Sequence, residues 1–310
     1  MKKVVIDCDV GVDDAMALIL AFRSRVLEVK AITGVNGNVP LDRVFENIQK
    51  VLSLIRPASH PLIAKGADKP LKGKTLYAHS VHGEDGLGGA HIPIKKEDHF
   101  WQLSSLPAEV LLPTLARQEP EELTLIATGP LTNLALGIQR DVEGMKRFKE
   151  MVIMGGAVRA SGNITPYAEF NLYSDPLAAQ IVFESGIPIT LVPLDVTHQV
   201  SLTPDFMEGK MKPLQNPFSN FIIQATGYDS FMRQFRNRER IFLHDPLAVG
   251  VAIDPTLVKT ERLSLRVETE EGPYYGRIIE FPEGPKLDVC LNVEVERFLD
   301  LFLSSLRGMG

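Results

Sequence analysis

The segment Asp7-Cys8-Asp9-Val10-Gly11-Val12-Asp13-Asp14 decides how the N-terminal part of this chain folds. It follows a short β-branched run, Val4-Val5-Ile6, which predicts a buried strand. It precedes a longer run from Ala15 to Phe22, rich in Ala and Leu, which predicts a helix. The segment is therefore a strand-to-helix turn, and Gly11 supplies the backbone freedom that this turn needs.

Four carboxylates stand within eight residues, and helix chemistry accounts for two of them. Asp13 and Asp14 would fall in the first helical turn, where the helix dipole favours negative charge and either residue could cap the helix. Asp7 and Asp9 would lie at the end of a buried strand, where an unpaired charge is costly. A bound cation removes this conflict, because Asp9 and Asp14 could both face a crevice beyond the strand. Capping combined with surface charge is the competing interpretation.

The ligands available at this turn are oxygen atoms, and no Cys or His stands nearby at the spacing of a zinc site. Carboxylate, carbonyl and water ligands suit Ca²⁺ or Mg²⁺. The turn therefore predicts a site for a hard divalent cation.

Composition excludes several classes of protein. The 310 residues are 45% hydrophobic and 23% charged, which predicts a packed globular protein, and the net charge of −6 argues against a nucleic-acid partner. Cys8 and Cys290 lie far apart and predict no disulfide framework. The N-terminus is too short for a signal peptide, and the apolar run 15–22 is too short to span a membrane. We therefore expect a cytoplasmic protein without a membrane partner.

Strand and helix signals alternate through the first two thirds of the chain. They predict a mostly parallel central sheet flanked by helices, a Rossmann-like α/β core, with a helical C-terminal part. The expected strands are 4–6, 29–35, 61–64, 123–127, 151–154, 189–194, 263–267 and 275–281, and the expected helices are 15–22, 40–55, 108–117, the turns after 131, 176–185, 204–211, 217–236, 246–253 and 293–306. Residues 65–99 show little periodicity and indicate a functional loop. No linker or repeat divides residues 1–310, so we expect one domain.

Polar residues follow the ends of several predicted strands. In parallel sheets, ligands bind beyond the carboxyl ends of the strands, so a shared site there explains the recurrence. The residues concerned are Asp7 and Asp9, Asn36 and Asn38, Thr128, and Gly155-Gly156.

Three further motifs have both an ordinary and a functional interpretation. His244-Asp245-Pro246 is typical of a helix start, but Asp245 could add a cation ligand and His244 an acid or hydrogen-bond donor. Gly162-Asn163 with Ala168-Glu169-Phe170-Asn171 could be a plain polar loop or could bind sugar hydroxyls. The glycines of 83–88 could cradle phosphate, although no phosphate-loop Lys follows them.

The motif Asp7-Cys8-Asp9-x-Gly11-x-Asp13-Asp14 resembles the N-terminal fingerprint of the inosine-uridine-preferring nucleoside hydrolase family. His244-Asp245-Pro246 and the Gly-Asn…Ala-Glu-Phe-Asn segment match further motifs of that family in the same order. Many members carry Pro where this chain has Val10, which reduces the rigidity of the turn but removes no ligand. The resemblance covers nearly the whole chain, from residue 7 to residue 245.

The resemblance implies metal-dependent hydrolysis of the N-glycosidic bond of small ribonucleosides, giving a free base and ribose through an oxocarbenium-like transition state. Ca²⁺ would be held by Asp9, Asp14, Asp245 and the carbonyl of Thr128. It would orient a water that Asp9 activates, while His244, with His82 as a second candidate, assists the leaving base. The ribose hydroxyls would bind Asp13, Asn38, Asn163, Glu169 and Asn171, with His82 near the nucleobase. Asp7 would orient metal ligands or water.

Subunit number and base preference follow less directly. The resemblance implies a homodimer or homotetramer. Base-choosing residues of the family fall within 228–243, where this chain has Phe231, Phe235 and an arginine-rich run, Arg233, Arg236, Arg238 and Arg240. This segment does not indicate a purine or a pyrimidine.

Two other functions compete with this interpretation. Asp7 and Asp9 after an N-terminal strand also suggest a haloacid-dehalogenase-type phosphatase, with Asp7 as nucleophile. That family's later acidic pair is missing, and His244-Asp245 would have no role. The second alternative is a non-catalytic nucleoside or ribose binder, which would not need a carboxylate that activates water.

Overall fold

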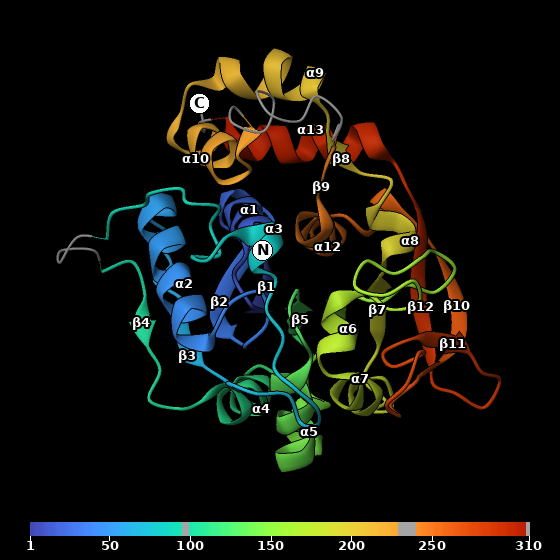
Figure 1. Cartoon of the computed structure of the whole chain (residues 1–310). Helices are drawn as coiled ribbons and strands as arrows, with labels where there is room; N and C mark the ends of the chain where they lie inside the picture. The colour runs from blue at the N-terminus through green and yellow to red at the C-terminus, as the bar shows by residue number, and fades with distance from the viewer. Residues whose placement is uncertain (95–98, 229–239, 308–310) are drawn as a thin grey trace.

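The computed structural model describes residues 1–94, 99–228 and 240–307 and is built on a ten-stranded sheet (Figure 1). Its order is β11-β10-β12-β7-β6-β5-β1-β2-β3-β4. The strands are β1 Lys2–Cys8, β2 Leu27–Gly34, β3 Leu62–Lys65, β4 Gln102–Leu103, β5 Leu123–Ala127, β6 Glu150–Met154, β7 Ile189–Val192, β10 Val258–Val267, β11 Ile278–Glu280 and β12 Lys286–Val293. The strands from β12 to β4 pair in parallel, and β10 and β11 add an antiparallel edge. The predicted mostly parallel sheet is confirmed.

Helices cover both faces of this sheet (Figure 1). One core includes apolar residues of α1 Val12–Arg23, α2 Leu41–Ile55, α10 Pro217–Ala225, α12 His244–Ile253 and α13 Val295–Leu306. The core on the opposite face includes residues of α4 Ala108–Gln118, α5 Thr132–Met145 and α7 Pro176–Phe183. Strand β1 contributes Val4 and Ile6 to the first core and Val5 to the second. Burial on both faces explains why its sequence is a continuous apolar run.

The order of the strands places a switch point beside β1. From β1 the chain continues outward through β2, β3 and β4, and then returns to pair β5 against the other side of β1 before continuing to β6 and β7. At such a reversal the loops after the two central strands part and leave a crevice beyond their carboxyl ends. The turn after β1 and the turn after β5 therefore border one crevice.

Several predicted elements differ in the structure. Strand β12 was not predicted, β10 begins earlier than expected, and β11 is shorter, because an edge pairing is decided by its neighbours more than by its own composition. The helix expected over 217–236 ends at Ala225, since Gly227 adopts a left-handed φ of 59°. Residues 229–236 of that prediction lie outside the described residues.

The remaining elements are short. They include α3 His79–His82, α6 Phe170–Ser174, α8 Leu194–Thr197, α9 Pro204–Phe206 followed by a π-helical turn over Met207–Met211, and a small sheet of β8 Ser201–Leu202 with β9 Ile241–Phe242. Of the predicted loop over 65–99, Lys65 ends β3, and the rest of its described part contains α3 and no other helix or strand. No helix in the described part of the chain is both long enough and apolar enough to cross a bilayer.

Candidate functional site

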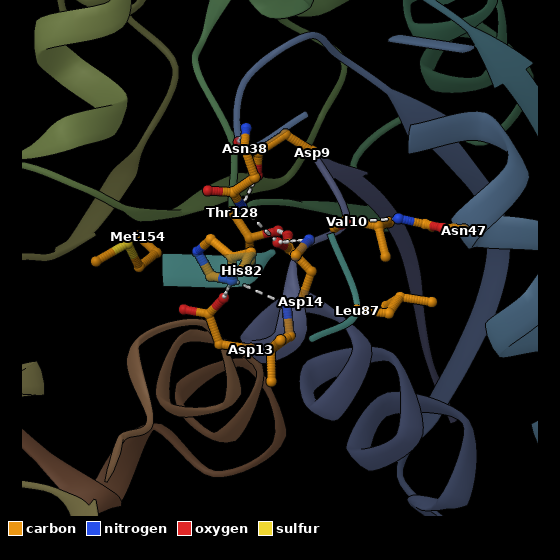
Figure 2. Close-up of polar contacts among 12 residues, drawn as sticks. Asp9, Val10, Asp13, Asp14, Asn38, Asn47, His82, Leu87, Thr128 and Met154 are labelled. Carbon is orange, nitrogen blue, oxygen red and sulfur yellow. Dashed lines mark hydrogen bonds and ion pairs between the residues drawn. The ribbon is translucent and has the colours of Figure 1, made fainter. Parts of the chain in front are cut away.

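The turn after β1 is held by Asp14. Gly11 caps helix α1, and its backbone N–H donates to Oδ2 of Asp14 at 2.8 Å. The other oxygen, Oδ1, accepts a hydrogen bond of 2.7 Å from the hydroxyl of Thr128, which follows β5 (Figure 2). The capping interpretation is therefore correct for Asp14, and the same carboxylate also joins the two sides of the crevice.

Asp9 is fixed by the loop that follows β2. Its Oδ2 accepts a 2.7 Å hydrogen bond from the backbone N–H of Asn38, and its Oδ1 accepts a 3.1 Å bond from the Asn38 side chain. The same amide nitrogen also lies 3.2 Å from Oδ2 of Asp14. Asn38, predicted to bind ribose, thus bridges two buried carboxylates in the structure (Figure 2).

A group of three carboxylates could hold a metal ion. Asp13, Asp14 and Asp245 each offer an oxygen, and these atoms lie within 4.8 Å of one another. The predicted ligands Asp14 and Asp245 are thus brought together, but Asp13, predicted to bind ribose, takes the place of Asp9 in this group. Sequence spacing could not separate these roles, because Asp13 meets Asp245 only through the packing of α1 against α12.

Burial makes the charges of this cluster unfavourable. Burial, followed by the charge of Asp14, raises the pKa of Asp9, while burial and the charge of Asp13 raise the pKa of Asp14 to about 6. The pKa of Asp245 is also raised, by burial and by the neighbouring carboxylates. Within the described ranges, Oδ1 of Asp13 is buried without a hydrogen-bond partner. A hard divalent cation fits this all-oxygen set, since it would stabilise the ionised carboxylates and give that oxygen a partner.

His82 reaches the cluster from α3. The backbone N–H of Val12 donates to its Nδ1 at 3.0 Å, and the same nitrogen lies 3.8 Å from Oδ1 of Asp13 (Figure 2). Burial lowers the pKa of His82 to about 4, so the ring is neutral at pH 7. Since Nδ1 accepts from a backbone amide, the ring proton resides on Nε2.

His244 stands at the start of α12, directly before Asp245. Its Nδ1 lies 2.8 Å from the hydroxyl of Thr197, at the end of α8. Its ring is 5.7 Å from that of His198 and 5.8 Å from that of Phe242, between centroids. Burial, followed by the neighbouring histidines, lowers the pKa of His244 to about 3, so this imidazole is neutral as well.

The three residues predicted to clamp a ribose all make hydrogen bonds within the protein. Glu169 caps α6 and accepts from the backbone N–H groups of Asn171, Leu172 and Gly156. The Asn171 amide donates to the carbonyl of Thr128 at 2.8 Å, which leaves that carbonyl a second lone pair. Asn163 is exposed and accepts from the backbone of Phe170 at 2.9 Å. Asn171 therefore links this loop to the predicted carbonyl ligand.

Asp7 orients one predicted ligand through its main chain, because its carbonyl accepts a 2.8 Å hydrogen bond from the backbone N–H of Thr128, but its side chain is directed elsewhere. Its Oδ2 accepts hydrogen bonds from the Thr33 hydroxyl and from the Asn133 amide, the latter at 2.7 Å. Burial raises its pKa to about 7. Asp7 follows Val5 on the face of β1 opposite to α1, so its side chain ties β1 to β2 and α5 instead.

Gly37 lets the Asn38 loop approach Asp9, and Ala at this position tests the site. A Cβ on Gly37 would overlap Oδ2 of Asp9 and would lie 2.8 Å from a ring carbon of Pro130. We expect Gly37→Ala to displace the carboxylate and to weaken Ca²⁺ binding by about tenfold or more, measured by titration calorimetry.

Gly209→Ala is the matched control for this substitution. A Cβ on Gly209 would have no heavy atom within 4 Å, so Ca²⁺ affinity should stay at the wild-type value. Equal affinity in the wild type and both variants would show that Asp9 has no part in cation binding.

Thr197 and Gly37 are residues that the sequence analysis missed. Thr197 follows β7 at the same edge of the sheet as the other site residues, so the rule that polar residues gather beyond strand ends could have found it. Gly37 carries no such signal, because its role depends on how close Asp9 lies. Of the base-choosing segment, residues 229–239, with Phe231, Phe235, Arg233, Arg236 and Arg238, lie outside the described residues, and Arg240 is exposed.

Comparison with known proteins agrees with this geometry over nearly the full length of the chain. Residues 4–300 match the model of the family described as inosine-uridine preferring nucleoside hydrolase. The pyrimidine-specific ribonucleoside hydrolase RihA of Salmonella schwarzengrund is 37% identical, over 98% of both chains. A plant nucleoside hydrolase structure superimposes with a TM-score of 0.91, 31% identity and 99% coverage of both chains. A purine-preferring ribonucleoside hydrolase from Gardnerella vaginalis gives a TM-score of 0.89, 30% identity and 98% coverage of both chains.

Proposed function

Since this chain belongs to the inosine-uridine preferring nucleoside hydrolase family, we propose that it hydrolyses the N-glycosidic bond of ribonucleosides, with a Ca²⁺ ion and Asp9 as the base. The products are a free nucleobase and ribose. The observation that carries the proposal is the group of Asp13, Asp14 and Asp245 at the switch point of the sheet, in which Asp14 and Asp245 are buried and Asp13 is partly buried. An isolated carboxylate cluster of this kind is costly unless a cation binds to it.

The residues that would hold the cation come from both sides of the crevice. Asp14 and Asp245 belong to the three-carboxylate group, and the Thr128 carbonyl keeps a free lone pair beside Asp14. When bound, Ca²⁺ would supply positive charge that polarises the oxygen atoms it contacts and stabilises the ionised carboxylates. Asp9 and Asp13 complete the ring of acidic groups around this position.

The role of Asp9 is to take a proton from the attacking water. Its oxygens are held by two hydrogen bonds from Asn38, so its position does not depend on the substrate. A carboxylate that is already held in position lowers the entropy cost of reaching the reactive geometry. Much of the rate enhancement from positioning arises in this way. The water oxygen forms a bond to the anomeric carbon as the bond from that carbon to the base nitrogen breaks, and the electron pair leaves with the base.

The leaving base needs a hydrogen-bond donor for the charge that it gains. His82 is buried and His244 is partly buried, both rings are neutral, and their Nδ1 atoms both face protein groups. We assign His244 as the main donor and His82 as the second. Asp13, Asn38, Asn163, Glu169 and Asn171 are proposed to bind the ribose hydroxyls, and the capping bonds of Glu169 would keep its carboxylate in place.

The structure argues against one alternative function, the phosphatase, and an incubation experiment tests the other, the non-catalytic binder. In a phosphatase Asp7 would be the nucleophile, but Asp7 has no exposed surface and bonds Thr33 and Asn133, so this alternative is wrong. A non-catalytic binder is separated from a hydrolase by what is recovered after incubation. Intact nucleoside would indicate a binder.

Four nucleosides test the proposed function directly. The purified protein is incubated with uridine, cytidine, inosine and adenosine, and reducing sugar is measured over time. We expect ribose release from at least one of them. The identity with relatives named pyrimidine-specific makes uridine and cytidine the first substrates to test. Recovery of all four nucleosides unchanged would contradict the proposal.

Three predictions about the whole molecule stay proposals. We propose a single domain over 1–310, because one sheet uses strands from both ends of the chain. A homodimer or homotetramer is proposed from the family resemblance, and light scattering after gel filtration would measure it. A cytoplasmic location, with no nucleic-acid or membrane partner, is proposed from the net charge and the short apolar segments.

A further inference from the structure

We propose that Thr197 is a positioning residue that holds the ring proton of His244 on Nε2, where it serves the leaving nucleobase. This inference rests on the proposed function for its catalytic meaning, but the tautomer itself can be measured without any turnover. Thr197 belongs to α8, a short helix after β7. It does not belong to the acidic cluster, and its side chain is fully buried.

The hydroxyl of Thr197 has one hydrogen-bond partner among the described residues, which is Nδ1 of His244 at 2.8 Å. A hydroxyl carries one hydrogen and can either donate to this nitrogen or accept from it. If Nδ1 carried the ring proton, the hydroxyl would accept it, and its own hydrogen would be left buried without an acceptor. A buried donor without a partner destabilises that arrangement.

The alternative arrangement satisfies both groups. With Nδ1 unprotonated, the Thr197 hydroxyl donates to it, and the single hydrogen of the neutral ring resides on Nε2. Protein groups commonly fix the tautomer of a functional imidazole in this way, through the nitrogen that does not act. The geometry therefore selects the Nε2–H form of His244.

The place of the His244 ring explains how the Nε2–H tautomer could assist the leaving base. Nε2 lies across the imidazole from Nδ1 and so points away from α8. In the sheet, β7 precedes α8 and stands two strands from β5 and three from β1, whose ends carry Thr128 and Asp9. Residue 244 also adjoins Asp245 of the three-carboxylate group. His244 therefore stands beside the carboxylate group where the reaction is proposed, and its Nε2 is the ring nitrogen that Thr197 does not engage.

The same device appears on the other histidine. Nδ1 of His82 accepts from the backbone N–H of Val12 at 3.0 Å, and a backbone amide can only donate. The two neutral rings are thus held in the same tautomer by unrelated parts of the fold. His82 is held by the main chain and resists substitution, whereas the bond to His244 can be removed by a single isosteric change, Thr197→Val.

A pair of substrates distinguishes assistance to the leaving group from other effects. Natural nucleosides lose a base that needs a hydrogen-bond donor, whereas p-nitrophenyl β-D-ribofuranoside loses a stable phenolate that does not. We expect Thr197→Val to lower kcat for the best nucleoside by about 10–100-fold, with KM changed by less than about threefold, and to leave nitrophenyl riboside turnover within about threefold of the wild type. Thr197→Ser should restore the nucleoside rate, because it keeps the hydroxyl.

Thr124→Val is the matched control. Its hydroxyl is also buried but donates to Glu150, near the opposite ends of β5 and β6, so both substrates should be hydrolysed at the wild-type rate.

In the double variant Thr197→Val with His244→Ala, the nucleoside rate should equal that of His244→Ala alone. Equal losses on both substrates, or an unchanged nucleoside rate in Thr197→Val, would overturn the proposal.

Nuclear magnetic resonance gives a readout that does not depend on activity. In protein labelled with ¹⁵N-histidine, the His244 signals, identified by their loss in His244→Ala, should show an unprotonated Nδ1 and a protonated Nε2. Thr197→Val should give a mixture of both tautomers. A wild-type ring protonated on Nδ1 refutes the inference even if the protein hydrolyses nucleosides. A wild-type protein that shows the Nε2–H form but releases no ribose refutes the proposed function instead.

Discussion

Asp9→Asn should lower the turnover of the best nucleoside substrate by about 10³-fold, because an amide cannot take a proton from water. The substitution keeps the size of the side chain and one oxygen that can accept from Asn38. It also removes one of several buried carboxylates that repel one another. The thermal midpoint of the cation-free variant should therefore be no lower than that of the wild type, which separates a catalytic loss from unfolding.

Asp42→Asn controls for the removal of a carboxylate as such. Asp42 is exposed and pairs with Lys65 at the surface, and such pairs contribute little to stability. Turnover and thermal midpoint should both match the wild type. If Asp9→Asn kept more than about a tenth of the wild-type turnover, Asp9 could not be the base of the reaction.

Removal of the cation should abolish ribose release, and added Ca²⁺ should restore it. The protein is treated with a chelator, dialysed and assayed for reducing sugar before and after titration with Ca²⁺ or Mg²⁺. Binding should also stabilise the fold, by about 2.7 kcal/mol at a Ca²⁺ concentration 100 times the Kd. For a chain of this length that free energy corresponds to an increase of about 4 °C in the thermal midpoint.

Asp245→Asn identifies where the cation acts. Asp245 belongs to the three-carboxylate group and is almost fully buried, so its loss should remove most of the Ca²⁺-dependent increase in the midpoint. Asp42→Asn should retain the full increase. Undiminished turnover in chelated protein that contains no metal by elemental analysis would exclude a metal-dependent reaction.

Local sequence patterns were sufficient for most of the parallel core. A β-branched run predicts strand β1, and a run rich in Ala and Leu predicts helix α1. In each run, the local conformation that the residues prefer is also the one that pairs the backbone hydrogen bonds and buries the apolar side chains. The antiparallel edge was harder to predict. Strands β10, β11 and β12 have mixed burial and depend on their neighbours for pairing, so composition alone began β10 too late, made β11 too long and missed β12.

The candidate site divides in a similar way. The eight residues from Asp7 to Asp14, together with His244-Asp245, indicated oxygen ligands and a place for them, since acidic groups at strand ends are costly without a partner. The roles of individual carboxylates depended on the fold. Asp13 lies close to Asp14 and Asp245 because α1 packs on α12. The side chain of Asp7 lies outside this group because alternate residues of β1 face opposite sides of the sheet.

The sequence by itself determined the class of fold, the family and the chemical type of the site, because these follow from periodicity and from the order of motifs along the chain. Only the tertiary structure decided which atoms meet. Thr197 and His244 are 47 residues apart, and the bond between them exists because α8 and α12 pack against each other beyond the same edge of the sheet. A hydrogen bond depends on distances of a few tenths of an ångström, and no local pattern of residues specifies those.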